Sequence, residues 1–428
     1  MTGLASAPAE AETRDQFIPV RKTDIIKALV GHASMGDAEA QKFQQLCRLL
    51  GSIFHYEYFD RLEKLRDDYF YFNPDLPVDP GLTPEALERA HDELVDTLVT
   101  VLKGANFTEI SRAEIDRSHE ERHFLKVEID APLDDYREVR LFERGHRRET
   151  MEVRKWWGLS RRKIETTVYE NVVLMVMIKL RSEMKSKRQL NRIIKNRLRP
   201  GAILIKYFRN IARPDLNMLF PEVRVVMSSF DKLFLGLPAL VGGVPIVLNL
   251  YATVTVLFLV LGFYLGISGA VQEDQLKTAL GALSGLVALG GFIARQWVKY
   301  QRQSLKYQKE LTDNVYYRNI NNNAGIFDYI IGAAEQQECK EAFLAYHFLH
   351  TADEPLTQPE LDRRIETWLK ERFGIDIDFE VDDALQKLDR LGVLKRDGER
   401  LSVPTIDDAL LRLDQVWDRY FQYAPAAE

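Results

Sequence analysis

One short segment of the sequence matches a known catalytic pattern. His119, Glu120 and His123 have the H-E-x-x-H spacing of zinc proteases, where two imidazoles one helical turn apart bind the metal and the Glu acts as base. That chemistry also needs a third ligand. Here both middle positions are charged, a strand pattern begins at Phe124, and no third ligand stands out downstream. We therefore expect a chance match in a charged linker, and assign no catalytic, metal-binding or cofactor-binding residue.

A second candidate is the Asn-rich segment YYRNINNNAG, residues 316–325. Because Asn and Gly tolerate left-handed backbone, one interpretation is the C-terminal cap of a preceding helix. The alternative is a polar site lined by amides, made of Tyr317, Asn322, Asn323, Gly325 and Glu338.

Three acidic residues follow at helical spacing. Glu335, Glu338 and Glu341 lie three apart, so they share one face of a predicted helix. With His347 they either gather a cation or form a solvated face, and the solvated face is the simpler interpretation. No Gly-rich phosphate loop, Gly-x-Ser-x-Gly elbow or Cys/His cluster is present. Whether the chain is an enzyme therefore stays open, and we lean toward a non-enzymatic role.

Long apolar segments occupy the middle of the chain. No charged residue occurs between Lys232 and Glu273, and a second uncharged run covers residues 278–294. Because about 20 apolar residues cross a bilayer, we predict a transmembrane hairpin within residues 233–299, with spans at about 245–268 and 278–296. The mean hydropathy of −0.24 limits any membrane part to a minority of the chain. Small residues four apart, such as Gly262 and Gly266, allow close helix packing or a homo-oligomer.

Basic residues follow the second predicted span on one face of a helix. By the positive-inside rule they place both termini in the cytoplasm, at a bacterial inner membrane or, in a eukaryote, the mitochondrial inner membrane. They are candidate contacts for anionic lipid headgroups: Arg295, Lys299, Arg302, Lys306 and Lys309.

Outside the apolar segments the pattern predicts an α+β fold, mainly helical at the N-terminus and β-rich in the middle. We expect a disordered tail at 1–16, an α+β domain at 17–232, a juxtamembrane helix with the Asn-rich segment at 300–350, and a winged-helix-like module at 351–428. Residues 141–200 hold 17 Lys and Arg against 6 Asp and Glu. Anionic lipid or a solvated face explains this basic half better than nucleic acid, whose sheet signature is missing.

The C-terminal module carries a capping box at Thr357–Glu360 and a hairpin turn at Asp397-Gly398. It holds 19 acidic against 11 basic residues, so contact with a protein fits better than contact with DNA. The two cysteines form no disulfide framework, which fits a reducing compartment.

The chain resembles a family of uncharacterised membrane proteins in four segments: FIPVRKTDII, YREVRLFERG, PDLNMLFPEVRVVMSSFDKLFLGLPAL and VYYRNINNNAGIFDYIIGAAEQQECKEAFLAYHFL. The family includes the mitochondrial transmembrane protein 143, with relatives in bacteria and plants. The resemblance implies a domain of unknown function with a transmembrane hairpin, and supplies no catalytic residue. The N-terminus lacks a transit-peptide pattern, which favours a bacterial source. We expect a membrane-anchored adaptor or regulator; the alternative is a membrane-associated enzyme with its site at the Asn-rich segment.

Overall fold

The computed structural model describes residues 14–32, 35–76, 81–115, 118, 128–130, 133–155, 160–195, 198–221, 224–226 and 316–421, and scattered positions between 258 and 309. The chain divides into two compact units. The first unit holds Met1–Arg112, Leu133–Arg213 and Asn319–Glu428, and the second holds Ala113–Pro132 and Pro214–Arg318.

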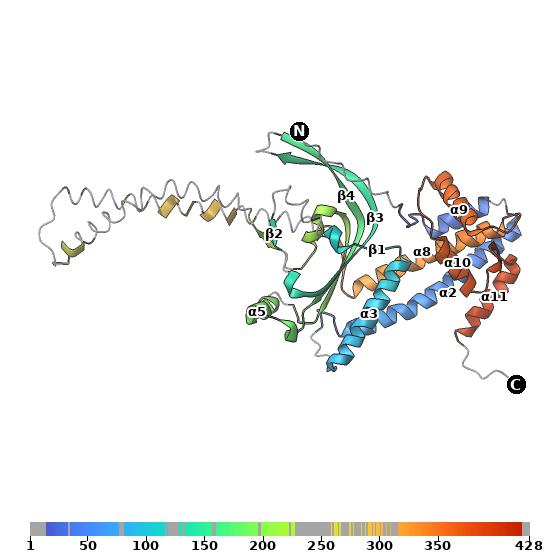
Figure 1. Ribbon diagram of the computed structural model, residues 1–428, viewed down its shortest axis with the longest axis horizontal. Helices are drawn as coiled ribbons and strands as arrows, with labels where there is room; N and C mark the ends of the chain where they lie inside the picture. Colours follow the sequence, from blue (N-terminus) through green and yellow to red (C-terminus); the bar gives the residue numbers. More distant parts are fainter. Residues whose placement is uncertain are drawn as a thin grey trace. The chain divides into compact units, whose positions relative to one another are not determined.

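A five-stranded antiparallel sheet organises the first unit (Figure 1). Its strands, in spatial order, are β1 (Thr108–Glu109), β3 (Tyr136–Lys155), β4 (Ser160–Ile178), β5 (Ile203–Ala212) and β7 (Asn319–Asn322). The strands β3 and β4 form one long hairpin, paired from Tyr136 and Ile178 to Lys155 and Ser160. Short segments complete this unit: η1 (Leu133–Asp135), η2 (Arg181–Glu183) and α5 (Lys187–Lys195).

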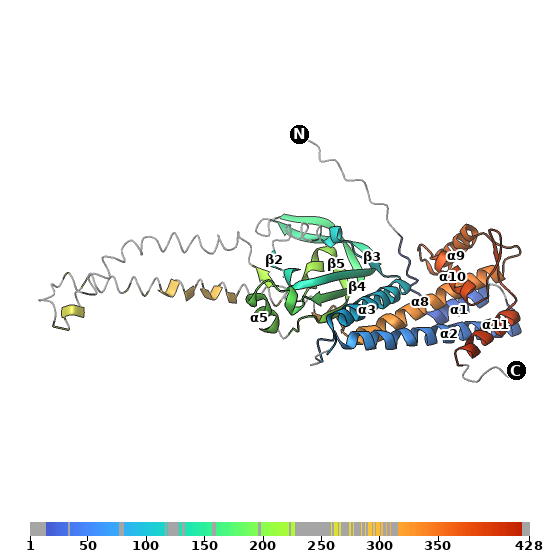
Figure 2. The ribbon, with the colours of Figure 1, turned by 60° about the horizontal axis from the view of Figure 1, so that its bottom comes forward.

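Three helices cover one face of the sheet (Figure 2). They are α2 (Asp37–Phe70), α3 (Pro84–Gly104) and α8 (Gly325–His350). Alternate residues of β5 point toward them, because side chains in a strand alternate between faces: Ile203, Ile205 and Tyr207 are all fully buried in the shared core. The helix α3 begins after Thr83, whose side chain accepts a hydrogen bond from the Ala86 amide.

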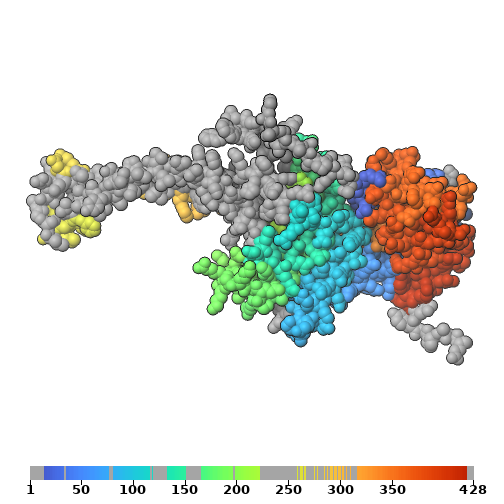
Figure 3. Space-filling model, in the orientation of Figure 1, coloured from blue at the N-terminus to red at the C-terminus, as the bar shows by residue number. Residues whose placement is uncertain are grey.

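A second core lies at the other end of α2 and α8. It joins them to α1 (Lys22–His32), α9 (Gln358–Phe373), α10 (Val381–Arg390) and α11 (Ile406–Arg419). In Figure 3 the orange and red C-terminal helices lie against the blue N-terminal ones. The β-hairpin of β8 (Lys395–Asp397) and β9 (Arg400–Ser402) is present, with Gly398 and Glu399 as its turn, one residue later than predicted.

Within the second unit, β2 (Glu128–Asp130) pairs antiparallel with β6 (Arg224–Val226). The 3-10 helix η3 (Arg213–Met218) starts at the last residue of the first unit. The H-E-x-x-H segment, residues 119–123, lies outside the described residues.

The α+β class is confirmed, but the predicted transmembrane hairpin is wrong for the chain as described. Among the described residues, none of the helices combines the length and apolar character that a bilayer crossing needs. Both long helices carry charged residues that disfavour a bilayer crossing: α2 has them along its length, and α8 has Asp328, Glu335, Glu338, Lys340 and Glu341. Most of residues 245–268 and 278–296 lies outside the described residues.

One strand, directly after the basic residues 141–200, is absent from the sequence prediction. Residues 203–212 form β5, which pairs with β4 on one side and β7 on the other. Its sequence, ILIKYFRNIA, is β-branched and aromatic, and an interior strand buries both faces.

Candidate functional site

A buried polar network joins α10 to α8. The amphipathic helix α10 turns Lys387 inward, where it is only 5% exposed. Its Nζ lies 2.5 Å from Glu341 Oε2, 2.6 Å from Asp383 Oδ2 and 3.8 Å from Glu338 Oε2. On the far side, the Tyr58 hydroxyl of α2 donates to Glu338 Oε1 at 2.5 Å. One lysine therefore serves three carboxylates inside the first unit.

This excess of acid sets the protonation of the network. Burial, opposed by the positive charge of Lys387, raises the pKa of Glu341 to about 7. Burial alone would lower the pKa of Lys387, but the three carboxylates outweigh it, so this pKa lies above its usual value. Burial and the neighbouring Glu338 also raise the pKa of the Tyr58 hydroxyl. The network therefore buries the Lys387 ammonium among three carboxylates, one of which, Glu341, has a raised pKa.

The predicted solvated face on α8 is wrong for two of its three acids, because Glu338 and Glu341 are 9% and 1% exposed. They lie on the face of α8 that α10 covers. His347 does not join them: its Nε2 lies 3.2 Å from Nδ1 of His32. Burial, followed by His32 and His350, lowers the pKa of His347 to about 3.

The Asn-rich segment builds a turn at the sheet edge. Asn323 has left-handed backbone, with φ of 51°. Its amide donates to the Ile205 carbonyl at 2.7 Å, and its side-chain Oδ1 accepts from the Ile205 amide at 3.3 Å. Its Nδ2 also donates to Asp75 Oδ2 at 2.8 Å. One side chain thus extends the pairing of β7 with β5 by one residue and leads the chain into α8.

The other residues of the predicted polar site separate into three places. Gly325 opens α8, where an added Cβ would come within 2.6 Å of Asn321 Oδ1. Asn322 pairs with Lys206 in the sheet. Tyr317 belongs to the second unit and is 81% exposed, and Glu338 lies in the buried network. The structure therefore brings together only Asn322, Asn323 and Gly325, and the polar site as a whole stays a prediction.

Four of the five predicted lipid-contact residues are described. Arg295, Lys299, Arg302 and Lys309 are exposed, and Lys306 lies outside the described residues. Their contact with lipid stays a prediction.

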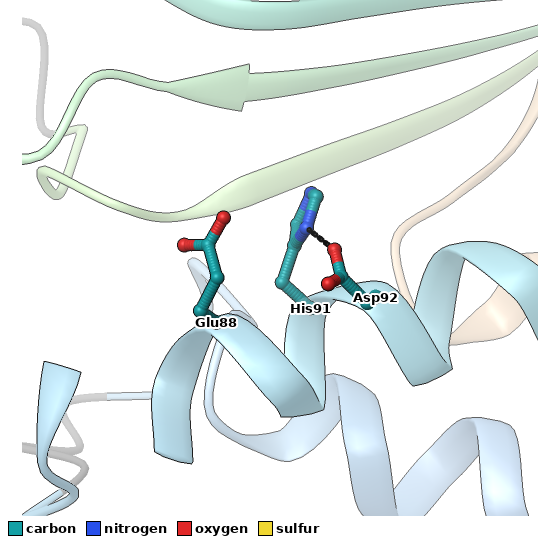
Figure 4. A group of neighbouring side chains, drawn as sticks. All are labelled: Glu88, His91 and Asp92. Atoms are coloured by element: carbon teal, nitrogen blue, oxygen red, sulfur yellow. Dashed lines mark hydrogen bonds and ion pairs between the residues drawn. The ribbon is translucent and has the colours of Figure 1, made fainter. Parts of the chain in front are cut away.

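A group with metal-binding side chains occurs on α3, where Glu88, His91 and Asp92 are neighbours (Figure 4). His91 Nδ1 lies 3.2 Å from Asp92 Oδ1, and its Nε2 lies 3.0 Å from Glu138 Oε2. Arg137 donates to Glu88 Oε1 at 2.5 Å. The Glu138 carboxylate raises the pKa of His91, and both imidazole nitrogens face carboxylates. This group is therefore an ion-pair cluster of the α3–β3 contact.

One groove of the first unit lies between α1, α2, α8 and α11 and has a volume of about 760 Å³. Its basic side chains are Lys22 and Lys27 from α1 and Arg48 and His55 from α2. Its aromatic wall consists of Tyr56, Phe59 and Trp417. We call this feature the cationic groove.

The charge of the cationic groove is only partly compensated. Its one carboxylate, Glu335, lies 2.8 Å from His55 Nδ1 and 3.8 Å from Lys22 Nζ. No carboxylate of the described residues lies within ion-pair distance of Lys27 or Arg48, and both side chains are exposed. Phe59 is 49% exposed. The groove therefore has two free cations and one exposed aromatic ring among its lining residues.

The sequence did not show this groove, because its walls come from residues more than 350 positions apart. The aromatic rings of Tyr56 and Trp417 meet with centroids 6.3 Å apart, and Tyr420 and Phe421 complete the contact. Only the unusual density of aromatic residues in HYEYF and VWDRYF was visible as a signal.

A second pocket, of about 730 Å³, lies between the ends of α1, α8 and α9. Its lining mixes acids and bases, including Glu39, Glu360, Arg363, Arg364 and His350. This balance gives it no preferred charge of ligand, so the cationic groove is the better candidate.

Residues 169–325 match the model of a protein family, DUF3754, which is described as a protein of unknown function. The match begins within β4, includes β5 and β7, and ends at the first residue of α8. No solved structure matches the chain.

Proposed function

We propose that the chain is a non-enzymatic adaptor or regulator that binds an acidic segment of a partner protein in the cationic groove. The carrying observation is that one groove is lined both by two free cations, Lys27 and Arg48, and by the exposed ring of Phe59. Aromatic residues and Arg supply most of the binding energy at protein interfaces. The partner segment would place carboxylates against Lys27 and Arg48 and one apolar side chain against Phe59.

The dimensions of the groove agree with this occupant. A volume of about 760 Å³ is within the range of pockets that bury a few side chains. The protein partner expected at the C-terminal module also fits, because Trp417 of that module forms one wall. Its walls are packed helices, so little ordering cost accompanies binding.

The test is photo-crosslinking of the full chain in cells. A benzophenone amino acid replaces Phe59 in one protein and Phe70 in a control; both rings are exposed on α2, but only Phe59 lines the groove. We expect the Phe59 probe to capture one partner through an acidic peptide, identified by mass spectrometry, and the Phe70 probe to miss it.

A charge reversal completes the experiment. Arg48→Glu places a carboxylate against the partner's own acids, so we expect the Phe59 crosslink to fall at least tenfold. Arg89→Glu on α3 makes the same change at an exposed residue outside the groove. Equal crosslinking by both variants, or a captured peptide that is basic, would refute the proposed site.

The finer part of the family resemblance belongs to the same proposal. Three statements stay predictions: that the chain is related to the membrane proteins around transmembrane protein 143, that its source is bacterial, and that it is located at a membrane. Cell fractionation tests the location: recovery of the chain in the soluble fraction would exclude it.

A further inference from the structure

A short N-terminal segment, Arg14–Ile18, crosses several elements of the first unit; we call it the strap. The Arg14 guanidinium binds both oxygens of Glu366, at 2.9 and 3.1 Å. The Asp15 carbonyl accepts from the Asp378 amide at 3.0 Å. The strap is therefore fastened at its exposed end to the α9–α10 connection.

The middle of the strap lies over two cations. Arg144 of β3 places its Cζ 4.1 Å from the centroid of the Phe17 ring, and Lys340 of α8 places its Nζ 5.1 Å from the same centroid. These side chains are 6% and 5% exposed. Lys340 also donates to the Ile18 carbonyl at 2.7 Å. A single aromatic ring thus covers a pair of buried like charges.

This pair has no carboxylate in direct contact, as buried cations normally have; Asp15 acts on Arg144 and Glu341 acts on Lys340 only at longer range. No carboxylate oxygen of the described residues lies within ion-pair distance of Arg144 or Lys340. Arg144 donates to the Ala105 carbonyl at 3.1 Å, while its Nε is buried with no hydrogen-bond partner. Burial lowers the pKa of both side chains, that of Lys340 to about 8. The face of Phe17 compensates for part of the missing negative charge.

We propose that Arg144 and Lys340 form an oxyanion-binding site that the strap closes with Phe17. When the strap lifts, the two cations are left facing an open polar surface. The planar Arg144 guanidinium and the Lys340 ammonium then bind a carboxylate or phosphate group, for which this pair of residues is suited. The amide of Gln337, which holds the Gln16 carbonyl at 3.5 Å, becomes available to the same ligand, whereas Asn106 still donates to Glu380 Oε2 at 3.0 Å.

The site differs from the cationic groove, since no residue of the pair lines that groove. It also differs from the Lys387 network, which holds an excess of acid instead of base. The strap connects the site to the groove through the chain, because Ile18 is followed within four residues by Lys22, the first residue of α1 and a groove residue.

The test uses the full-length protein with inorganic phosphate and, separately, acetate, against sodium chloride at matched ionic strength. Phe17→Ala removes the ring from the cations. We expect its melting temperature to rise saturably, by about 3–6 °C at ligand concentrations far above Kd. The response to phosphate or to acetate identifies the class of ligand. Phe17→Ala with Arg144→Met should show no such rise.

A gentler variant makes the test independent of the folding of Phe17→Ala. Arg14→Ala unfastens only the exposed end of the strap, so a larger fraction of molecules is open and the apparent affinity measured by calorimetry should rise several-fold over the native chain. Arg21→Ala, which removes an exposed arginine paired with Asp24, is the matched control and should not change it. Binding that survives Arg144→Met and disappears in Arg48→Glu would belong to the groove and overturn the proposal. No saturable response to either anion in Arg14→Ala would also overturn it.

Discussion

Lys387 of α10 and Glu341 of α8 form an ion pair inside the first unit, with Nζ and Oε2 2.5 Å apart and both side chains at most 5% exposed. Such a pair is costly to bury and costlier to break, because one uncompensated charge is then left out of water. The pair lies where the C-terminal helices meet the central helix α8, and Asn106 extends it to Glu380 at 3.0 Å. The packing of the C-terminal helices against α8 is therefore sensitive to a single charge.

The first prediction follows from that sensitivity. Lys387→Met leaves three carboxylates without their cation, and we expect the free energy of unfolding to fall by about 3–5 kcal/mol at pH 7.5. Urea denaturation followed by circular dichroism measures the loss. The double variant Lys387→Met with Glu341→Gln removes both charges and should recover at least half of it. A single variant as stable as the native chain would show that the pair contributes nothing.

Much of the helical fold could be predicted from local signals. The helix α9 begins at the capping box of Thr357 and Glu360. It ends at Gly374, whose backbone is left-handed. The β8–β9 hairpin also follows from a local signal, Asp397-Gly398, although its turn lies one residue later, at Gly398 and Glu399. These signals are carried by a few adjacent residues, so they need no knowledge of the tertiary structure.

The remaining features depend on contacts between distant residues. The sequence predicts a solvated face for Glu338 and Glu341, because charged residues are usually exposed. Only the approach of Lys387 from α10 allows their burial. The strand β5 was missed because Pro200 and Pro214 stand on either side of it, and prolines so placed are typical of an irregular segment. The cationic groove needs α11 beside α2, which no local pattern specifies.

A second prediction separates a structural from a catalytic role for the Asn-rich segment. Asn323→Ala loses the side-chain hydrogen bonds to Ile205 and Asp75 and places an alanine at φ of 51°. We therefore expect the free energy of unfolding, measured by urea denaturation, to fall by about 2–3 kcal/mol. Asn323→Gly keeps the backbone relaxed and should lose less. If Asn323→Ala keeps native stability, the amide is free for chemistry, and the enzyme alternative gains support.

A third prediction concerns the cluster on α3. Since Arg137 holds Glu88 and both nitrogens of His91 face carboxylates, zinc or a chelator should move the melting temperature of the native chain by less than about 1 °C. Scanning calorimetry with and without zinc measures this. The variant Arg137→Gln with Glu138→Gln frees the Glu88 carboxylate and His91 Nε2, and should gain a zinc-dependent rise. A zinc response of the native chain that His91→Gln removes would establish a metal site.

The last prediction is a pH dependence that comes from His347. This imidazole is fully buried, its Nδ1 has no hydrogen-bond partner, and the groups that face it are His32 and the rings of Phe43 and Phe348. Its folded pKa of about 3 lies below the unfolded value near 6.5, so the unfolded chain binds more protons between these limits. The stability due to a neutral His347 is present above pH 6.5 and is lost as the pH falls toward 3, by up to about 1.4 kcal/mol per unit.

Urea denaturation at pH 5.0 and pH 7.0 measures this loss. We expect the native chain to lose about 2 kcal/mol more than His347→Gln between the two values, because the variant has no imidazole to protonate on unfolding. The exposed His55 provides the control, and His55→Gln should keep the native dependence. His91, whose pKa is raised, is present in every one of these proteins, so its contribution cancels in the comparison. Parallel curves for the native chain and His347→Gln would mean that protons reach His347 in the folded state, and that the contact between α1 and α8 opens in acid.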